Sequence, residues 1–171
     1  MRLFVAIDLP PELQERIREL EEGLGSSFRK MDPADIHLTI KFLGEVRDEK
    51  LDKVKAALSS VRMSEVKLES TKLGSFPHVL WLGVKLNSEL AQLQQEVQRA
   101  VRPFAMNDPR AFKPHLTIAR FERLSGEDEA LLKGLLKERV EERWKACSFT
   151  LYQSMLTAAG PRYEALARFP A

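Results

Sequence analysis

Two histidines of this chain begin the same four-residue segment, His-Leu-Thr-Ile, once at His37 and once at His115. The chain has only three histidines, so the repetition involves most of its imidazole groups. In an extended strand, side chains two residues apart lie on the same face. Thr39 therefore shares a face with His37, and Thr117 shares a face with His115, while the aliphatic residues between them point into the core.

An imidazole beside a hydroxyl, presented twice, is suited to acid–base chemistry on a phosphate diester. Imidazole titrates near pH 6.5, so at neutral pH one ring can accept a proton while another donates one. The threonine hydroxyls can donate hydrogen bonds to an oxygen-rich anion. If both pairs face one cleft, one histidine can activate water while the other protonates the departing oxygen.

A single His-x-Thr has an ordinary explanation, because threonine favours strands. A second histidine that extends to the same four letters is expected by chance at roughly one in several thousand. Gene duplication explains the repetition, but it does not explain why the residues of the exposed face are the ones kept. The pattern therefore favours a functional site.

The similarity between the two halves extends beyond these segments. FVAIDLPPEL, from Phe4, aligns with WLGVKLNSEL, from Trp81, and VKLESTKL, from Val66, aligns with FTLYQSML, from Phe149. Helical periodicity follows the first strand of each half. The residues that carry it are Leu13, Ile17, Leu20 and Leu24 in one half, and Leu90, Leu93, Val97 and Val101 in the other. Each half therefore reads strand, helix, HLTI strand, helix, strand.

We predict a single bilobal domain over residues 1–171, with an internal repeat of about 3–74 and 79–156 and a last strand at 162–169. The expected strands alternate apolar and polar residues, which is typical of sheets that are open on one face. This favours an α+β fold over a doubly wound parallel sheet. The expected architecture is two pseudo-symmetric lobes, each an antiparallel-rich sheet with helices on its outer face, and an active-site cleft between them.

Composition narrows the setting. The formal charge of +2 is too mild to indicate nucleic-acid binding by bulk electrostatics, although a local basic groove is compatible with it. The single cysteine, Cys147, excludes an intramolecular disulfide framework and is expected to be a small residue near a strand start rather than a catalytic thiol. The first apolar run is broken by Asp8 and by Pro10, so it predicts neither a signal peptide nor a membrane span. A cytoplasmic monomer is the expectation.

The two HLTI segments resemble the paired HxTx motifs of the two-histidine (2H) phosphoesterases. The chain is most similar to the LigT/ThpR-like RNA 2′,3′-cyclic phosphodiesterases among them, a group also described as 2′-5′ RNA ligases. The resemblance covers essentially the whole chain, since four further segments are similar to that family. These are RLFVAIDLP, SFPHVLWLG, FKPHLTIAR and YQSMLTAAGPRYEALARF.

The resemblance implies a bilobal α+β fold and an activity that requires no metal or other cofactor. The implied reaction opens a terminal 2′,3′-cyclic phosphate of RNA and leaves a 2′-phosphomonoester, with 2′-5′ ligation as the related reverse chemistry. His37 matches the proton donor, His115 the proton acceptor, and Thr39 and Thr117 the phosphate-binding threonines. From the residues alone the two histidines are equivalent, so which is acid and which is base stays open. The RNA partner also stays open: tRNA fragments, other RNA ends and small cyclic nucleotides all fit.

The strand face of the other residues near the motifs is predicted from alternation and from the resemblance. Arg120 matches a family arginine that contacts phosphate, but simple alternation puts it on the core side, so the strand must twist or bulge there. Lys41 has the parity to contact phosphate, and a solvated side chain is the alternative. Phe42 and Trp81 are expected to pack in the core, and His78 to be structural or solvated. The charged run from residue 127 to residue 145 is expected to be a solvated helix face.

Two alternatives accompany this hypothesis. A metal hydrolase could use His37, His115 and His78 as ligands around an open coordination position, although no HxH or HExxH motif supports it. A non-catalytic module that binds RNA ends or nucleotides could keep the cleft without turnover. Chelator treatment and product analysis distinguish these alternatives from the two-histidine mechanism.

Overall fold

A computed structural model describes residues 1–170 and contains two antiparallel sheets, so the predicted α+β class is confirmed. The first sheet has the strand order β3-β1-β8-β9 and the second has the order β2-β6-β5-β4-β7. The strands of the first sheet are β1 (Arg2–Asp8), β3 (His37–Glu45), β8 (Phe149–Thr157) and β9 (Gly160–Phe169). The strands of the second sheet are β2 (Arg29–Lys30), β4 (Val66–Phe76), β5 (Val79–Val84), β6 (His115–Arg120) and β7 (Arg143–Ala146).

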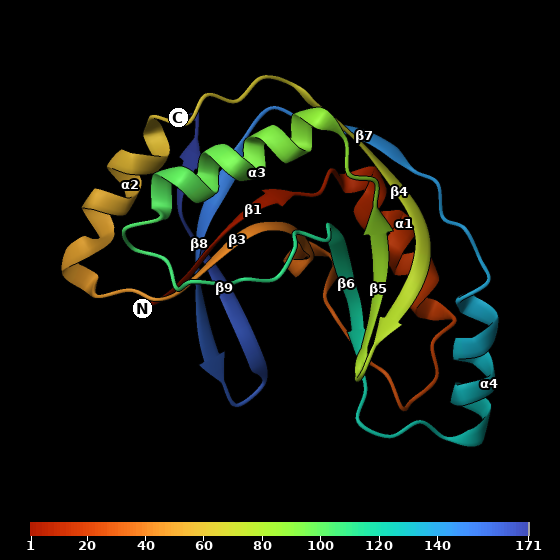
Figure 1. The fold of residues 1–171 in the computed structure, drawn as a ribbon. Helices are drawn as coiled ribbons and strands as arrows, with labels where there is room; N and C mark the ends of the chain where they lie inside the picture. The colour runs from red at the N-terminus through yellow and green to blue at the C-terminus, as the bar shows by residue number, and fades with distance from the viewer. Residues whose placement is uncertain (171) are drawn as a thin grey trace.

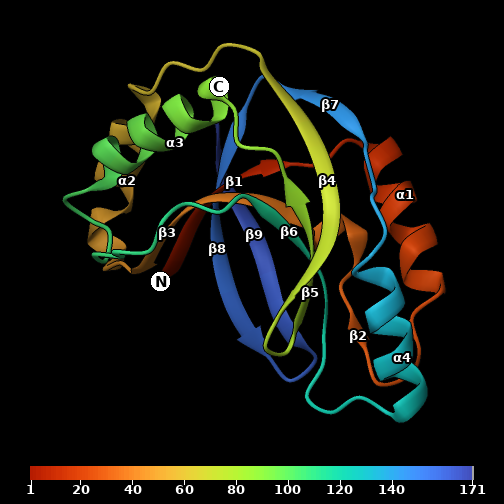
Figure 2. The same ribbon diagram turned by 45° about the vertical axis from the view of Figure 1, so that its right-hand side comes forward.

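The helices divide between the two sheets, as Figures 1 and 2 show. The α-helices are α1 (Pro11–Glu22), α2 (Leu51–Ser59), α3 (Ser88–Val101) and α4 (Gly126–Leu135), and short 3₁₀ turns lie at Pro33–Asp35 and Asp48–Lys50. Helices α2 and α3 lie beside the first sheet, where α3 contacts β3. Helices α1 and α4 lie beside the second sheet, where α1 contacts β6.

The elements follow one another in the same order in the two halves of the chain, but neither sheet is formed by one half alone. Strand β4 ends the first half and pairs with β5 of the second sheet. Strand β8 ends the second half and pairs with β1 of the first sheet. Helix α1 follows β1 yet contacts β6, and α3 follows β5 yet contacts β3. The two sheets are therefore tied together by crossing connections, and the cleft between them is built from both halves.

Most of the residues that helical periodicity predicts to face the core are buried. Leu13 and Ile17 of α1 are buried, as are the four predicted positions of α3. Leu24 is also buried, but it lies just past the end of α1. The aliphatic residues of both HLTI segments are at most 2% exposed, which leaves the histidines and threonines on the opposite face of each strand. The alternation within the motifs is thus confirmed.

The charged run from residue 127 to residue 145 is only partly helical. Helix α4 ends at Leu135, and Arg143–Ala146 form β7 at the edge of the second sheet. The prediction of a helix face is wrong there because Val140, Trp144 and Ala146 are buried, and alternate burial is typical of a strand. Cys147 is exposed between β7 and β8.

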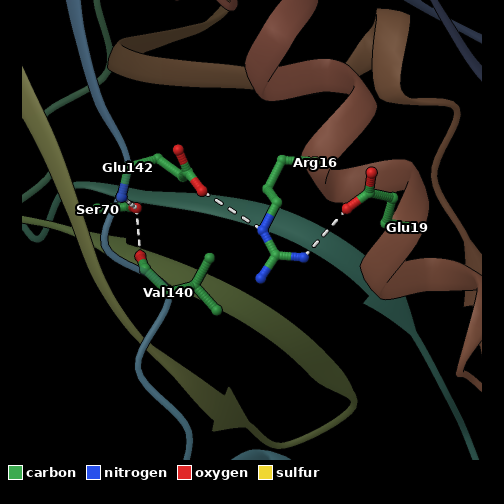
Figure 3. A network of polar contacts seen from close by, with 5 residues as sticks. All are labelled: Arg16, Glu19, Ser70, Val140 and Glu142. Atoms are coloured by element: carbon green, nitrogen blue, oxygen red, sulfur yellow. Dashed lines mark hydrogen bonds and ion pairs between the residues drawn. The ribbon is translucent and has the colours of Figure 1, made fainter.

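Polar contacts connect α1, β4 and the segment before β7 (Figure 3). The Ser70 hydroxyl donates to the Val140 carbonyl and accepts a hydrogen bond from the Glu142 amide at 2.9 Å. Arg16 lies 3.4 Å from the Glu142 carboxylate and 3.3 Å from that of Glu19. Exposed ion pairs add little stability. The segment is held as extended backbone by the buried Ser70 contacts together with backbone hydrogen bonds to β4, such as that from the Val140 amide to the Thr71 carbonyl at 2.8 Å. No helix in residues 1–170 is both long and apolar enough to cross a membrane.

Candidate active site

A β-bulge in β6 places Arg120 on the same face as Thr117. The register of β6 against β5 shifts between Thr117 and Ala119, which leaves Ile118 as an extra residue. Ile118 and Ala119 are both buried, and Arg120 is exposed. An extra residue reverses the alternation beyond it. The irregularity that Arg120 needs to reach the cleft is therefore present.

Strand β3 has the same bulge, and it moves Phe42 out of the core. The register against β1 shifts between Thr39 and Lys41, so Ile40 is the extra residue. The next buried position is Leu43, and Phe42 is 55% exposed. The prediction that Phe42 packs in the core is wrong because strict alternation does not continue past the bulge.

The two bulges occur at aligned isoleucines, so Phe42 and Arg120 occupy corresponding positions. Both line the same hollow between the sheets. One half of the chain thus contributes an aromatic ring where the other contributes a guanidinium. The two halves supply the same residue types at the histidine and threonine positions and different residue types at this third position.

Residues of both HLTI strands line this hollow, which has a volume of about 290 Å³. His37 and Thr39 come from β3, whereas Thr117 and Arg120 come from β6. Tyr163 of β9 lines it as well, on the side of the first sheet. Since β3 and β6 belong to different sheets and contact one another, the hollow lies at the junction of the two lobes. Four of the six predicted site residues are brought together here.

His115 lies at the start of β6, beyond the lining of that hollow. It is half-buried and on the same face of β6 as Thr117. Its ring packs edge-on against Phe76, with ring centroids 5.5 Å apart, and against Trp81 at 6.2 Å. Its Nδ1 lies 2.7 Å from the Lys113 carbonyl oxygen. A carbonyl only accepts, so Nδ1 carries the proton, and Nε2 of the neutral ring keeps a lone pair that can accept one.

Among the described residues, His37 forms an ion pair with a carboxylate and His115 forms none. Its Nε2 lies 3.8 Å from Oδ1 of Asp8, the last residue of β1. Asp8 is held by two hydroxyls: Tyr152 donates to Oδ1 at 2.5 Å and Thr150 donates to Oδ2 at 3.0 Å. The residue aligned with Asp8 in the second half is Lys85, an exposed residue just after β5. The environment of the two histidines is therefore different in charge.

Burial and neighbouring charges shift the pKa of His37 in opposite directions. The side chain is 8% exposed, and this burial lowers the pKa of His37 below its ordinary value. The carboxylates of Asp8 and Asp35 favour the protonated ring and raise the pKa in part. Burial together with the Asp8 carboxylate raises the pKa of Tyr152, so its hydroxyl stays protonated and remains a donor.

Three aromatic rings lie beside the His37 imidazole. Its centroid lies 4.4 Å from that of Tyr152, 5.6 Å from Tyr163 and 6.0 Å from Phe4. Burial raises the pKa of Tyr163, while the nearby Arg120 opposes that effect. Arg120 of one lobe therefore lies close to Tyr163 of the other.

Trp81 does not pack in the hydrophobic core. It is half-buried, opposite Thr117 and Gly74, and its indole covers Gly74, where a Cβ would come within 2.1 Å of the ring. The ring lies 5.2 Å from Phe76 and beside His115. Trp81 thus supports His115 from the cleft face of the sheet, so the expectation of a core position was wrong.

Lys41 and His78 lie away from the hollow that contains His37. Lys41 lines a separate hollow with residues of α3, among them Arg99 and Arg102. His78 lies in the turn between β4 and β5 and lines a third hollow. The metal hydrolase alternative needs His78 beside both motif histidines, which this placement does not provide. Within residues 1–170 no three His, Cys, Asp or Glu side chains are grouped as metal ligands would be.

Asp8, Tyr152 and Tyr163 were missed by the sequence analysis. Asp8 had a usable signal, because the aligned halves place a carboxylate at Asp8 and an ammonium group at Lys85. The two tyrosines had none, since they come from β8 and β9, and only the pairing of β8 with β1 and of β9 with β8 brings them into this sheet.

Asp8→Asn is expected to change the pH dependence of turnover. If His37 is the acid, the rate falls as pH rises through its pKa, which forms the alkaline limb of the profile. Asp8 raises that pKa, so removing its charge moves the alkaline limb to lower pH and lowers kcat several-fold above neutral pH, with little loss on the acidic limb. The measurement is kcat against pH for the wild type and the variant.

Tyr152→Phe is the matched control, because it keeps the ring beside His37 and the carboxylate of Asp8 while removing one hydrogen bond. Tyr152→Phe should move the alkaline limb of the pH profile less than Asp8→Asn does. A shift of the acidic limb instead would assign His37 as the base, and an unmoved profile would remove Asp8 from the mechanism.

Comparisons with known proteins agree with this geometry. Residues 9–155 match the family described as the 2′-5′ RNA ligase superfamily. The chain is 33% identical to an RNA 2′,3′-cyclic phosphodiesterase of Archaeoglobus fulgidus over 99% of both chains, and 31% identical to one of Methanocaldococcus jannaschii over 97% and 98%. The crystal structure of Escherichia coli LigT complexed with 3′-AMP superimposes with a TM-score of 0.81 at 28% identity, covering 98% of this chain and 96% of LigT.

This chain belongs to the 2′-5′ RNA ligase superfamily, and the resemblance to the 2H phosphoesterases is therefore confirmed. The narrower resemblance to the LigT-like RNA 2′,3′-cyclic phosphodiesterases is confirmed as well, since the similarity to them extends over almost the whole length of both partners.

Proposed function

We propose that this protein hydrolyses the terminal 2′,3′-cyclic phosphate of RNA to a 2′-phosphomonoester by two-histidine general acid–base catalysis, without a metal. The observation that carries the proposal is the single hollow lined by His37, Thr39, Thr117 and Arg120 from both HLTI strands. Relatives named RNA 2′,3′-cyclic phosphodiesterase at about full length support the choice of substrate.

The cyclic phosphate binds between β3 and β6. The hydroxyls of Thr39 and Thr117 donate hydrogen bonds to its non-bridging oxygens from opposite lobes. The Arg120 guanidinium neutralises the charge that develops on these oxygens, for which its forked donors are better suited than an ammonium group. Lys41 faces another hollow, so we propose no phosphate contact for it.

The proton transfers divide between the two histidines. Nε2 of His115 accepts a proton from water as its oxygen attacks phosphorus, because Nδ1 is committed to the Lys113 carbonyl. The Asp8 carboxylate favours the protonated form of His37 against the effect of burial, and in that form His37 donates its proton to the ribose 3′-oxygen as the bond from phosphorus to that oxygen breaks. The products are a 2′-phosphomonoester and a free 3′-hydroxyl, with one water consumed.

The same groups would catalyse 2′-5′ ligation if a 5′-hydroxyl of a second strand replaced water. The description of the matching family as 2′-5′ RNA ligases is the observation that favours testing this activity. RNA with a cyclic phosphate end, tRNA fragments among them, is the proposed partner, and a cytoplasmic monomer remains the expected state.

Product analysis tests the proposal. A defined RNA with a terminal 2′,3′-cyclic phosphate is incubated with the protein in excess chelator, and the 2′-phosphate and 3′-phosphate products are separated. We expect complete conversion to the 2′-phosphate, unchanged by the chelator. Addition of an RNA with a 5′-hydroxyl tests ligation in the same assay.

The alternatives give different results. Tight binding without conversion would support the non-catalytic module. Loss of activity with chelator and recovery with added metal would support the metal hydrolase. A 3′-phosphate product would mean that the 2′-oxygen, not the 3′-oxygen, leaves.

A further inference from the structure

A second hollow adjoins the active site and shares Arg120 with it. It has a volume of about 670 Å³ and is lined by Arg29, Arg123, His78 and Phe121 as well as Arg120. Arg120 also lines the hollow that contains His37. The two hollows therefore share one lining residue, Arg120, at the end of β6.

Three arginines, Arg29, Arg120 and Arg123, line this second hollow. Within residues 1–170, the ion pairs include none of Arg29, Arg120 and Arg123, and Glu122 is the single acidic residue of the lining. Arg29 lies directly opposite Arg120 in the pairing of β2 with β6. Like charges directly opposite one another in a sheet are destabilising. Phosphate groups bound in a row along these arginines would offset that repulsion.

The backbone beside these arginines is held in an uncommon conformation. His78 has φ of 68°, in the left-handed region that residues other than glycine rarely adopt. Two contacts with Phe121 hold it: the Phe121 amide donates to the His78 carbonyl at 3.1 Å, and His78 Nδ1 lies 3.2 Å from the Phe121 carbonyl oxygen. Such strain concentrates at functional sites. Here it leaves the exposed imidazole at the edge of the arginine cluster, where a base can stack on it.

We propose that this hollow binds the sugar–phosphate backbone of the RNA strand that precedes the terminal cyclic phosphate. The inference rests on the proposed function, because it places the rest of the same substrate. Arg120 contacts the reacting phosphate, and Arg29 and Arg123 contact phosphates further along the strand. Backbone contacts of this kind give affinity without base sequence preference. The protein thereby prefers RNA ends over cyclic mononucleotides.

Another cationic hollow offers a rival path. Lys41, Arg99 and Arg102 line it, over α3, with a volume of about 560 Å³. It shares none of its lining residues with the hollow that contains His37. A strand whose end is held at Arg120 passes directly into the hollow of Arg29 and Arg123, which favours that path.

A pair of double variants tests the proposal. Arg29→Ala/Arg123→Ala removes two exposed charges from the proposed path, and Arg99→Ala/Arg102→Ala removes two exposed charges from the rival path, so the net charge of the two variants is the same. Each is assayed with a ribo-oligonucleotide that ends in a 2′,3′-cyclic phosphate and with adenosine 2′,3′-cyclic phosphate, over a range of salt. Thermal melting verifies that both variants fold.

Each single-strand phosphate contact adds about 0.7 to the slope of log affinity against log salt concentration. Loss of two contacts in the first variant is therefore expected to lower kcat/KM for the oligonucleotide roughly 25-fold at 0.1 M salt, relative to a 1 M reference at which these contacts contribute nothing. The salt slope of this variant should fall by about 1.4, and its hydrolysis of the mononucleotide should not change. The second variant should behave like the wild type. An equal loss in both variants, a loss in the second alone, or no loss in either would overturn the inference. Failure of the wild type to hydrolyse either substrate would instead reject the proposed function.

Discussion

Replacing His37 or His115 by alanine is expected to lower kcat for cyclic phosphate hydrolysis by about 10²–10⁴-fold, the usual contribution of one general acid or base. Folding should persist, because the variants keep the buried leucines and isoleucines that both strands contribute to the core. Circular dichroism and thermal melting verify the fold, and single-turnover rates measure the chemical step. A variant with near-normal turnover would reject the assignment for that histidine.

A change of leaving group separates the acid from the base. A p-nitrophenyl phosphodiester releases p-nitrophenolate, a stable anion that leaves without being protonated. Its cleavage therefore does not need the general acid. With this substrate the loss caused by His37→Ala should shrink strongly, whereas the loss caused by His115→Ala should stay large. The opposite pattern would exchange the two roles, and equal losses with both substrates would contradict the division proposed here.

Arg120→Ala is expected to lower kcat by about 10²–10³-fold, as removal of one donor to a developing oxyanion typically does. The effect is on kcat more than on KM if the guanidinium acts on charge that develops in the transition state. Arg120→Lys should recover part of the loss, since an ammonium group keeps the charge but not the forked geometry. Steady-state kinetics on a cyclic mononucleotide measure both variants.

Arg143→Ala is the matched control for charge. Arg143 is exposed on β7, the edge strand of the second sheet that is more distant from β6. It lies 3.8 Å from the Glu69 carboxylate. Its removal should leave kcat unchanged. If Arg120→Ala raised KM alone, the arginine would be a ground-state binding residue rather than a stabiliser of the transition state.

Arg120 and Phe42 illustrate the limit of alternation as a guide to strand faces. The pattern was correct for His37, Thr39, His115 and Thr117 because they precede the bulges. It was wrong for Phe42, which lies past the bulge at an aligned isoleucine. A bulge is visible only in the pairing with a neighbouring strand, so local periodicity has no information about it.

Local sequence patterns located most of the helices and strands within each half of the chain. Helical spacing located α1 and α3, and apolar alternation located the strands, because burial imposes those periods locally. The short β2 and β7 were not predicted, since a two-residue pairing and an edge strand leave little pattern. The arrangement of β4 and β8 in opposite sheets depends on pairings between residues far apart in the chain, which no window of sequence contains.

The sequence by itself determined which groups we propose for the chemistry: two histidines, each with a threonine on the same strand face, in an α+β scaffold of repeated order. Only the tertiary structure decided their surroundings. It placed Asp8 and Tyr152 beside His37, whereas the part of the chain that the structure describes has no ion pair between His115 and a carboxylate, and it set Arg29 opposite Arg120. The physical reason is that composition and spacing determine what a segment can bury, whereas charge neighbours arise from long-range strand pairing. That pairing makes two formally equivalent histidines unequal.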